Sequence, residues 1–174
     1  MVPFDLPAVI SLLGGNSAAI ARLDEFFAEV NAGPNRPHAW IGNEPGVWAP
    51  WAYTFAGAPS RTQATVRRIQ RELFDTTPGG LPGNDDGGAT SAWYVFSALG
   101  LYPMIPGVGG LSVGSPLFPD AVVHLANGAP LHITASSDGP YVTALRVNGA
   151  EISNFWLDWS QLASGATLEF ELAP

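Results

Sequence analysis

Two adjacent carboxylates in a glycine-rich turn are the side chains of this sequence best suited to acid–base chemistry. Asp85 and Asp86 lie within Gly83–Gly88, and the aromatic-rich run Ser91–Leu99 follows. Backbone amides at the start of a helix favour negative charge, and glycine lets a ligand approach the main chain. Carboxylates held there can act as a general base or as ligands to a hard cation. The alternative is that one of them only caps the helix.

A second polar turn, Gly42-Asn43-Glu44-Pro45, offers amide and carboxylate oxygens beside a backbone that proline restrains. Such oxygens are the ligands that calcium prefers, but the spacing does not match an EF-hand loop. The alternative is an Asx-type turn that binds nothing. Trp48, a few residues further on, has a ring on which a sugar could stack, whereas most aromatic residues in helices belong to a core.

Composition narrows the class of protein. Hydrophobic residues make up 47% of the 174 residues and charged residues 13%, which indicates a globular chain. A formal charge of −8 argues against a nucleic-acid partner. The absence of cysteine excludes disulfides and thiolate metal sites. No stretch is typical of a signal peptide or of a membrane span, so we expect a soluble chain with no membrane partner.

The first hundred residues show the 3.6-residue periodicity of helices. Asn16 or Ser17 is placed to cap the second helix. In the segment 62–74 we expect Val66 and Ile69 to face inward and Arg67 to face outward. The predicted helical segments are 6–13, 16–30, 49–55, 62–74 and 91–99.

Beyond Pro106 the periodicity changes from 3.6 to 2 residues, which predicts strands. Asn127-Gly128 and Asn148-Gly149 are typical of tight hairpin turns. The predicted strands are Leu111–Val113, Ala121–Leu125, Leu131–Ala135, Val142–Val147 and Thr167–Leu172.

The helices of the first part are too few to cover one another. Ser91–Leu99 is apolar on almost every face, which indicates a buried helix. Three or four such helices cannot bury all their apolar faces together. They fit an incomplete α/α toroid, in which further helix pairs close the ring.

Several motifs in a fixed order carry a resemblance to a known family. The GNDD element at Gly83–Asp86 and the run SAWYVFSALGLYP from Ser91 follow Gly42-Asn43-Glu44-Pro45 and precede Gly114-Ser115-Pro116-Leu117-Phe118. Together they resemble the C-terminal part of the family 92 glycoside hydrolases, the calcium-dependent exo-acting α-mannosidases. The resemblance runs from about Val2 to the C-terminus.

The resemblance implies an α+β fold: the C-terminal helices of an (α/α)6 toroid, followed by a short antiparallel β segment. Residues 1–105 would belong to the catalytic barrel and 106–174 to the β segment. Asp86 would be the general base, with Asp85 and Asn84 orienting the water or a sugar hydroxyl. The general acid of the family lies upstream of the match to Val2, so we expect the isolated chain to be inactive.

The same resemblance makes Glu44 and Asn43 candidate contacts to calcium and to the sugar. Many family members follow this turn with serine and histidine, where this sequence has Gly46, Val47 and Trp48. Trp48 becomes a candidate sugar contact, and the identity of the glycan is left open. Family membership suggests a secreted or periplasmic location.

The function implied is removal of terminal α-mannose from a glycan, with inversion and with calcium, in company with the upstream portion of the same enzyme. The alternative is a non-catalytic carbohydrate-binding or structural module that lacks the general acid. An upstream segment that encodes an aromatic stretch with a glutamate would favour the enzyme.

Overall fold

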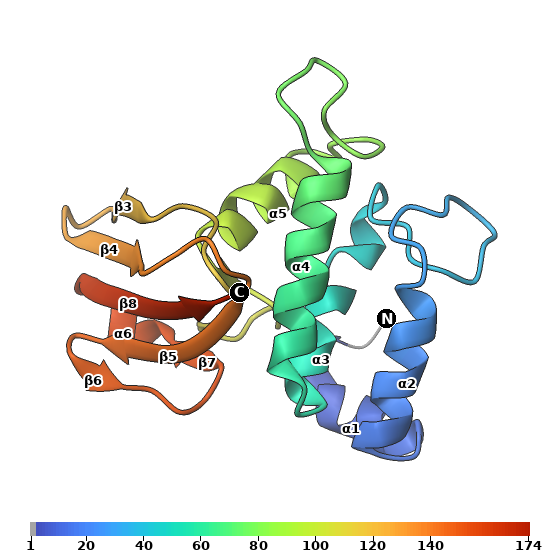
Figure 1. Cartoon of the computed structure of the whole chain (residues 1–174), viewed down its shortest axis with the longest axis horizontal. Helices are drawn as coiled ribbons and strands as arrows, with labels where there is room; N and C mark the ends of the chain where they lie inside the picture. The colour runs from blue at the N-terminus through green and yellow to red at the C-terminus, as the bar shows by residue number, and fades with distance from the viewer. Residues whose placement is uncertain (1–2) are drawn as a thin grey trace. The chain divides into compact units, whose positions relative to one another are not determined.

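The computed structural model describes residues 3–174, so Val2 at the start of the resemblance lies outside the described residues. The chain divides into two compact units, Met1–Val95 and Phe96–Pro174 (Figure 1). The first unit is helical and the second is mostly strand. The predicted α+β class is confirmed. The predicted assignment of 1–105 to a barrel and 106–174 to a β segment stays a prediction.

Short helices and loops make up the first unit, and its longest helix is α4. The last helix, α5, begins in this unit and ends in the second. The elements are η1 (Pro3–Asp5), α1 (Leu6–Leu12), α2 (Asn16–Phe26), η2 (Glu44–Gly46), η3 (Ala49–Trp51), α3 (Ala52–Phe55), α4 (Pro59–Leu73) and α5 (Ala89–Ala98).

The starts of α1 and α2 are set by different devices. Asp5 caps α1, since its carboxylate accepts a hydrogen bond from the amide of Ala8 at 3.1 Å. The expected cap of α2 is wrong by one position. Gly15, with φ 94°, precedes the helix and makes no side-chain bond, and Asn16 is already the first helical residue. A glycine is favoured there because its backbone is left-handed.

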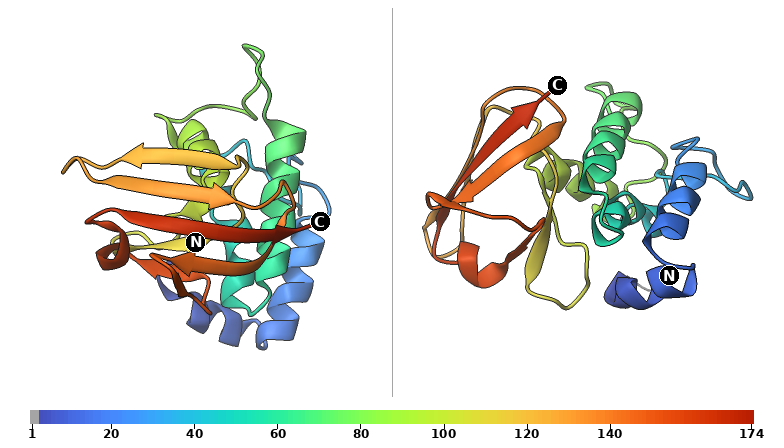
Figure 2. Two further views of the ribbon diagram at one scale, coloured as in Figure 1. Left: turned by 60° about the vertical axis from the view of Figure 1, so that its left-hand side comes forward. Right: turned by 60° about the horizontal axis from the view of Figure 1, so that its bottom comes forward.

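Helix α4 packs alongside α3 (Figure 2) and ties α2 into the unit. The guanidinium of Arg68 donates to the carbonyl oxygen of Phe27 at 2.7 Å, just after α2 ends. Val66 and Ile69 are buried as predicted, but the expected exposure of Arg67 is wrong, because Arg67 is only 4% exposed. It lies on a buried polar stripe with Gln63 and Gln70, three or four residues away along the same face.

The apolar helix α5 is only partly covered. Trp93 is buried, but Val95 is 57% exposed and Phe96 is 38% exposed. The expectation of a buried helix therefore holds only in part, and the exposed faces agree with the expectation that the helices of this chain cannot cover one another. The described residues do not supply enough apolar surface to cover all of its faces.

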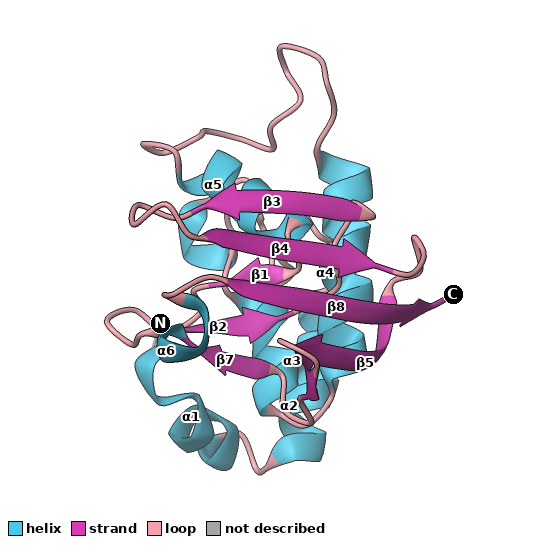
Figure 3. Cartoon of the chain, turned by 90° about the vertical axis from the view of Figure 1, so that its left-hand side faces the viewer, coloured by secondary structure: helices cyan, strands magenta, loops and turns pink. Residues whose placement is uncertain are grey.

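The second unit contains a three-stranded sheet of order β1-β2-β7 and a five-stranded sheet of order β3-β4-β8-β5-β6 (Figure 3). Their inner faces share one core, in which Leu111 and Leu157 of the small sheet join Ile133, Leu168 and Phe170 of the large one. The elements are β1 (Leu101–Tyr102), β2 (Gly110–Val113), β3 (Asp120–His124), β4 (Pro130–Ala135), β5 (Tyr141–Val147), β6 (Ala150–Glu151), β7 (Trp156–Asp158), α6 (Trp159–Leu162) and β8 (Ala166–Ala173).

The pairing of these strands is antiparallel except for β4 and β8, where Ile133 lies opposite Leu168 in a parallel ladder. Asn148 and Gly149 both have positive φ, 51° and 80°, as the predicted tight turn between β5 and β6 requires. The five predicted strands are found with ends that differ by one residue or less. Three short strands and α6 were not predicted.

Within residues 3–174 no single helix has the length and hydropathy of a membrane span, although α1 and α2, bent by 93° at their break, pass that test as a pair.

Candidate functional site

The first candidate loop is held in place by a short antiparallel contact. Asn31 and Trp40 form an isolated bridge, and the amide of Ile41 donates to the carbonyl oxygen of Val30 at 3.2 Å. The amide of Gly42 then donates to the side-chain oxygen of Asn31 at 3.1 Å. These bonds fix the backbone that leads into Asn43 and Glu44 within the first unit.

The loop and the glycine-rich turn meet through their backbones, although forty residues separate them in the sequence. A Cβ on Gly42 would lie 2.8 Å from the carbonyl oxygen of Pro82. A Cβ on Gly83 would overlap the carbonyl oxygen of Gly42. Glycine is thus required on both sides of the contact, and the two predicted motifs lie side by side in the first unit.

Asp85 is the residue that caps α5. One oxygen of its carboxylate accepts from the amide of Ser91 at 2.8 Å, and the other accepts from the Ser91 hydroxyl at 3.1 Å. The backbone oxygen of Asp85 also accepts from the amides of Gly88 and Thr90. These bonds fix the turn to the helix and occupy both carboxylate oxygens, so the capping alternative applies to Asp85.

The side chain of Asp86 differs from that of its neighbour. Its side chain is exposed, and within residues 3–174 no hydrogen bond engages its carboxylate. Its φ is 49°, in the left-handed region that residues other than glycine seldom adopt, although aspartate tolerates it better than most. A carboxylate in this position is open to water and can accept a proton from it.

Asn84 completes the turn. Its side chain is exposed, and its backbone oxygen accepts from the hydroxyl of the buried Thr90 at 3.0 Å. The start of α5 thus anchors the turn twice, through Thr90 and through Ser91. Ser91 was not predicted as part of the site, although its place at the third position of the helix is one from which a cap is commonly bonded.

Asn43 and Glu44 lie at the start of η2, where Glu44 is exposed and Asn43 is half-buried. The amide of Gly46 bonds to the backbone oxygen of Asn43 at 2.9 Å, but the Asn43 side chain makes no capping bond. The Asx-type alternative is therefore not formed. Among residues 3–174 no group of three acidic or histidine side chains is placed to hold a metal. Asn43 and Glu44 fit calcium by donor type, as part of a shell only.

Trp48 is half-buried and lines a shallow hollow of about 220 Å³ together with Arg22, Leu23, Phe26 and Pro45. Its indole Nε1 is buried and, among the described residues, has no hydrogen-bond partner. Pro45, the residue that follows Glu44, is one of the residues that line the hollow. Trp48 therefore lies beside the loop in a hollow, and its role as a sugar contact stays a prediction.

Several other aromatic side chains of the first unit belong to its core. Trp51, Tyr53 and Trp93 are buried, and Phe74 stacks on Trp93 with their ring centroids 5.7 Å apart. Burial, and then the hydrogen bond that its hydroxyl donates to Asp24, raise the pKa of Tyr53 above its usual value. The buried rings of Trp51, Tyr53 and Trp93 therefore offer no surface for a sugar.

The sequence profile of the glycosyl hydrolase family 92 catalytic domain matches residues 1–174. A family GH92 α-mannosidase from Bacteroides thetaiotaomicron, solved in complex with mannoimidazole, is 32% identical with a TM-score of 0.90 over 99% of this chain and 24% of its own. A family GH92 inverting mannosidase from the same species is 31% identical with a TM-score of 0.86 over 98% of this chain and 26% of its own.

A curated relative from the fungus Arthroderma benhamiae, described as an uncharacterized secreted glycosidase, is 31% identical over 177 residues. That match covers 98% of this chain and 22% of the relative. The chain therefore spans about a quarter of the length of the relatives that it matches.

Proposed function

Because the chain belongs to glycosyl hydrolase family 92, we propose that it forms the C-terminal part of an exo-acting α-mannosidase that removes terminal α-linked mannose from glycans with inversion. The mannosidase relatives support the substrate and the stereochemistry. The observation that carries the proposal is that the two aspartates of the turn differ in hydrogen bonding and in exposure. Asp85 is committed to the helix, while Asp86 beside it is exposed and without a partner among residues 3–174.

In an inverting glycosidase a carboxylate activates water, and a carboxylic acid about 6.5–9.5 Å away protonates the leaving oxygen. Asp86 takes the role of the base: it accepts a proton from water as the water oxygen bonds to the anomeric carbon. The bond from that carbon to the glycosidic oxygen breaks, and the acid protonates this oxygen. The anomeric centre is thereby inverted.

Asp85 and Asn84 act as positioning residues for that base. Asp85 holds the turn through its two bonds to Ser91, and the backbone oxygen of Asn84 is held by Thr90. The exposed amide side chain of Asn84 can then donate to, or accept from, the attacking water or a sugar hydroxyl. A preorganised turn of this kind spares reorganisation during the reaction.

The general acid would come from another part of the complete enzyme, since the family resemblance implies that it lies upstream of the match to Val2. Glu44 matches a different family position and does not replace it. The helices of the first unit would then be the last helices of an (α/α)6 toroid. The exposed side chain of Val95 on α5 supports this, since further helices would cover it.

Glu44 and Asn43 would supply part of a calcium shell, with the remaining ligands from elsewhere in the complete enzyme. Bound calcium would hold hydroxyls of the mannose ring and favour a distorted ring shape. Trp48 would stack on a sugar ring through its half-exposed face. The description of the fungal relative as secreted supports a location outside the cytoplasm.

The test is hydrolysis of α-mannobiose by the complete enzyme and by the 174-residue chain, each with and without EDTA. We expect the complete enzyme to release mannose and EDTA to suppress the release. We expect no turnover by the isolated chain. A complete enzyme that binds mannobiose without cleaving it would instead support the non-catalytic binding module.

A further inference from the structure

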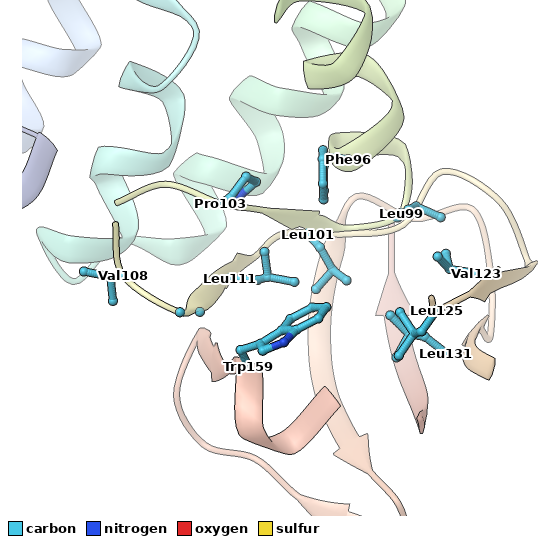
Figure 4. Close-up of a pocket in the computed structure, with 12 residues that line it drawn as sticks. Phe96, Leu99, Leu101, Pro103, Val108, Leu111, Val123, Leu125, Leu131 and Trp159 are labelled. Carbon is cyan, nitrogen blue, oxygen red and sulfur yellow. The ribbon is translucent and has the colours of Figure 1, made fainter. Parts of the chain in front are cut away.

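An apolar slot of about 370 Å³ opens at one end of the second unit (Figure 4). Leu101 and Leu111 of the small sheet line one side, and Val123 and Leu131 of the large sheet line the other. Trp159 of α6 lies beside Leu101 and Leu111 in the same view. The two sheets that share a core elsewhere therefore leave a gap between them here.

The mouth of the slot exposes large apolar side chains to solvent. Val108 is 50% exposed, Trp159 is 46% exposed and Phe96 is 38% exposed. None of the residues that line the slot is charged. Apolar surface gathered in this way marks an interaction site. The lack of charge is typical of the core of a permanent interface rather than of a transient one.

The slot is bordered by an open sheet edge, because β3 is the outermost strand of the five-stranded sheet. The amide of Ala135 donates to the carbonyl oxygen of Pro119, and the amide of Leu125 donates to that of Ala129. Since paired and unpaired positions alternate in an antiparallel ladder, the backbone groups of Val122 and His124 point away from β4. Such an edge readily pairs with a further extended segment.

Of the three occupants that could fill the slot, the rest of the same polypeptide fits best. A second copy of this chain is opposed by the charge of −8 on each copy. A small ligand would need polar groups to orient it, and the lining is almost wholly aliphatic or aromatic. The relatives, in contrast, are about four times as long as the region that this chain matches.

We propose that an apolar segment from the part of the complete enzyme that precedes this chain lies along the open edge of β3 and fills the slot beside Trp159. This rests on the proposed function in one respect only, that the chain is part of a longer polypeptide. The slot is then an internal interface that joins the β-rich unit to the rest of the enzyme.

The absence of cysteine in this chain allows a direct test by thiol labelling. Val108→Cys places a thiol at the mouth of the slot, and Ser153→Cys places a matched thiol on an exposed loop of the same unit. In the complete enzyme, with any cysteine outside this segment replaced, each thiol is reacted with a maleimide under native conditions and again in urea.

We expect the thiol at position 108 to react at least roughly tenfold more slowly than that at 153 in the native enzyme, because labelling requires local opening. The two rates should become equal in urea. Equal native rates would overturn the proposal, as would protection that appears only with dimer formation at high concentration. Catalytic activity is not the readout, so an inactive enzyme with a protected thiol would refute the proposed function and leave this inference standing.

Discussion

Gly83 lies so close to Gly42 that a Cβ on Gly83 would overlap the Gly42 carbonyl oxygen. This backbone contact joins the loop that carries Asn43 and Glu44 to the turn that carries Asp85 and Asp86. The contact is made by backbone atoms, and it is possible only because Gly42 and Gly83 have no side chains. The candidate base and the candidate sugar contact are therefore positioned by the same pair of glycines.

Gly83→Ala should displace this contact and disturb the site. Gly83 also has a φ of 75°, which an alanine adopts at a cost of roughly 1–2 kcal/mol. Gly87→Ala is the matched control, since Gly87 has a φ of 70° and nothing within 4 Å of its Cβ position. Both variants should lower the melting temperature, but only Gly83→Ala should lose most of its activity. Equal losses of activity would show that the contact does not position the site.

Asp85→Ala should act mainly on stability. The carboxylate that accepts from the amide and hydroxyl of Ser91 is a helix cap, and loss of a cap costs about 1 kcal/mol. Thermal unfolding of the complete enzyme measures this. Ser91→Ala removes one of the two bonds, and we expect it to produce a smaller decrease. An unchanged melting temperature in Asp85→Ala would contradict the capping role.

Glu44→Gln should weaken the calcium dependence of the complete enzyme. The variant keeps the size of the side chain and removes its negative charge, which hard cations prefer. After chelation, calcium should restore activity in the wild type at lower concentration than in the variant, and magnesium should restore it poorly because it requires a tighter octahedral shell. Calorimetric titration with calcium gives the affinity. An unchanged affinity in Glu44→Gln would remove Glu44 from the shell.

Tyr53→Phe should change how the first unit responds to alkaline pH. Burial, and then the hydrogen bond to Asp24, raise the pKa of Tyr53 above the value of 10.0 that it would have in the unfolded chain. The stability contributed by this group is therefore complete below pH 10 and is lost as the pH rises above 10 toward the folded value. At neutral pH the variant should lose about 1 kcal/mol, the usual contribution of one hydrogen bond.

Unfolding by denaturant at pH 8 and at pH 11 measures this effect. The wild type should lose more stability than Tyr53→Phe between the two values. An equal loss in both proteins would mean that the Tyr53 hydroxyl is not the group responsible.

The strands could be predicted from the sequence because each alternates apolar and polar residues and is bounded by turns with a fixed chemistry. Asn148-Gly149 requires positive φ at both positions, and the structure has it. The short strand β7 could not be predicted, because Trp156–Asp158 has no alternation long enough to see. It is defined by pairing with β2, which lies more than forty residues away.

The candidate site shows the same limit. The residue types at Asn43, Glu44, Asp85 and Asp86 were enough to name these positions as candidates for acid–base chemistry or for contacts to calcium and sugar. Residue types and spacing alone could not separate the two aspartates, which only the family resemblance distinguished, because the difference in their bonding depends on where Ser91 lies at the start of α5. Nor could they predict that Arg67 is buried, since the burial of one side of α4 depends on its neighbours.

The assignment of Asp86 as the base of an inverting α-mannosidase is tested most directly by proton NMR of α-mannobiose hydrolysis in the complete enzyme. The wild type should release β-mannose first, before mutarotation. Asp86→Asn keeps the shape of the side chain but cannot accept the proton, so kcat should fall by about 10²–10⁴-fold. A first product with the α configuration, or near-wild-type turnover in Asp86→Asn, would contradict the assignment.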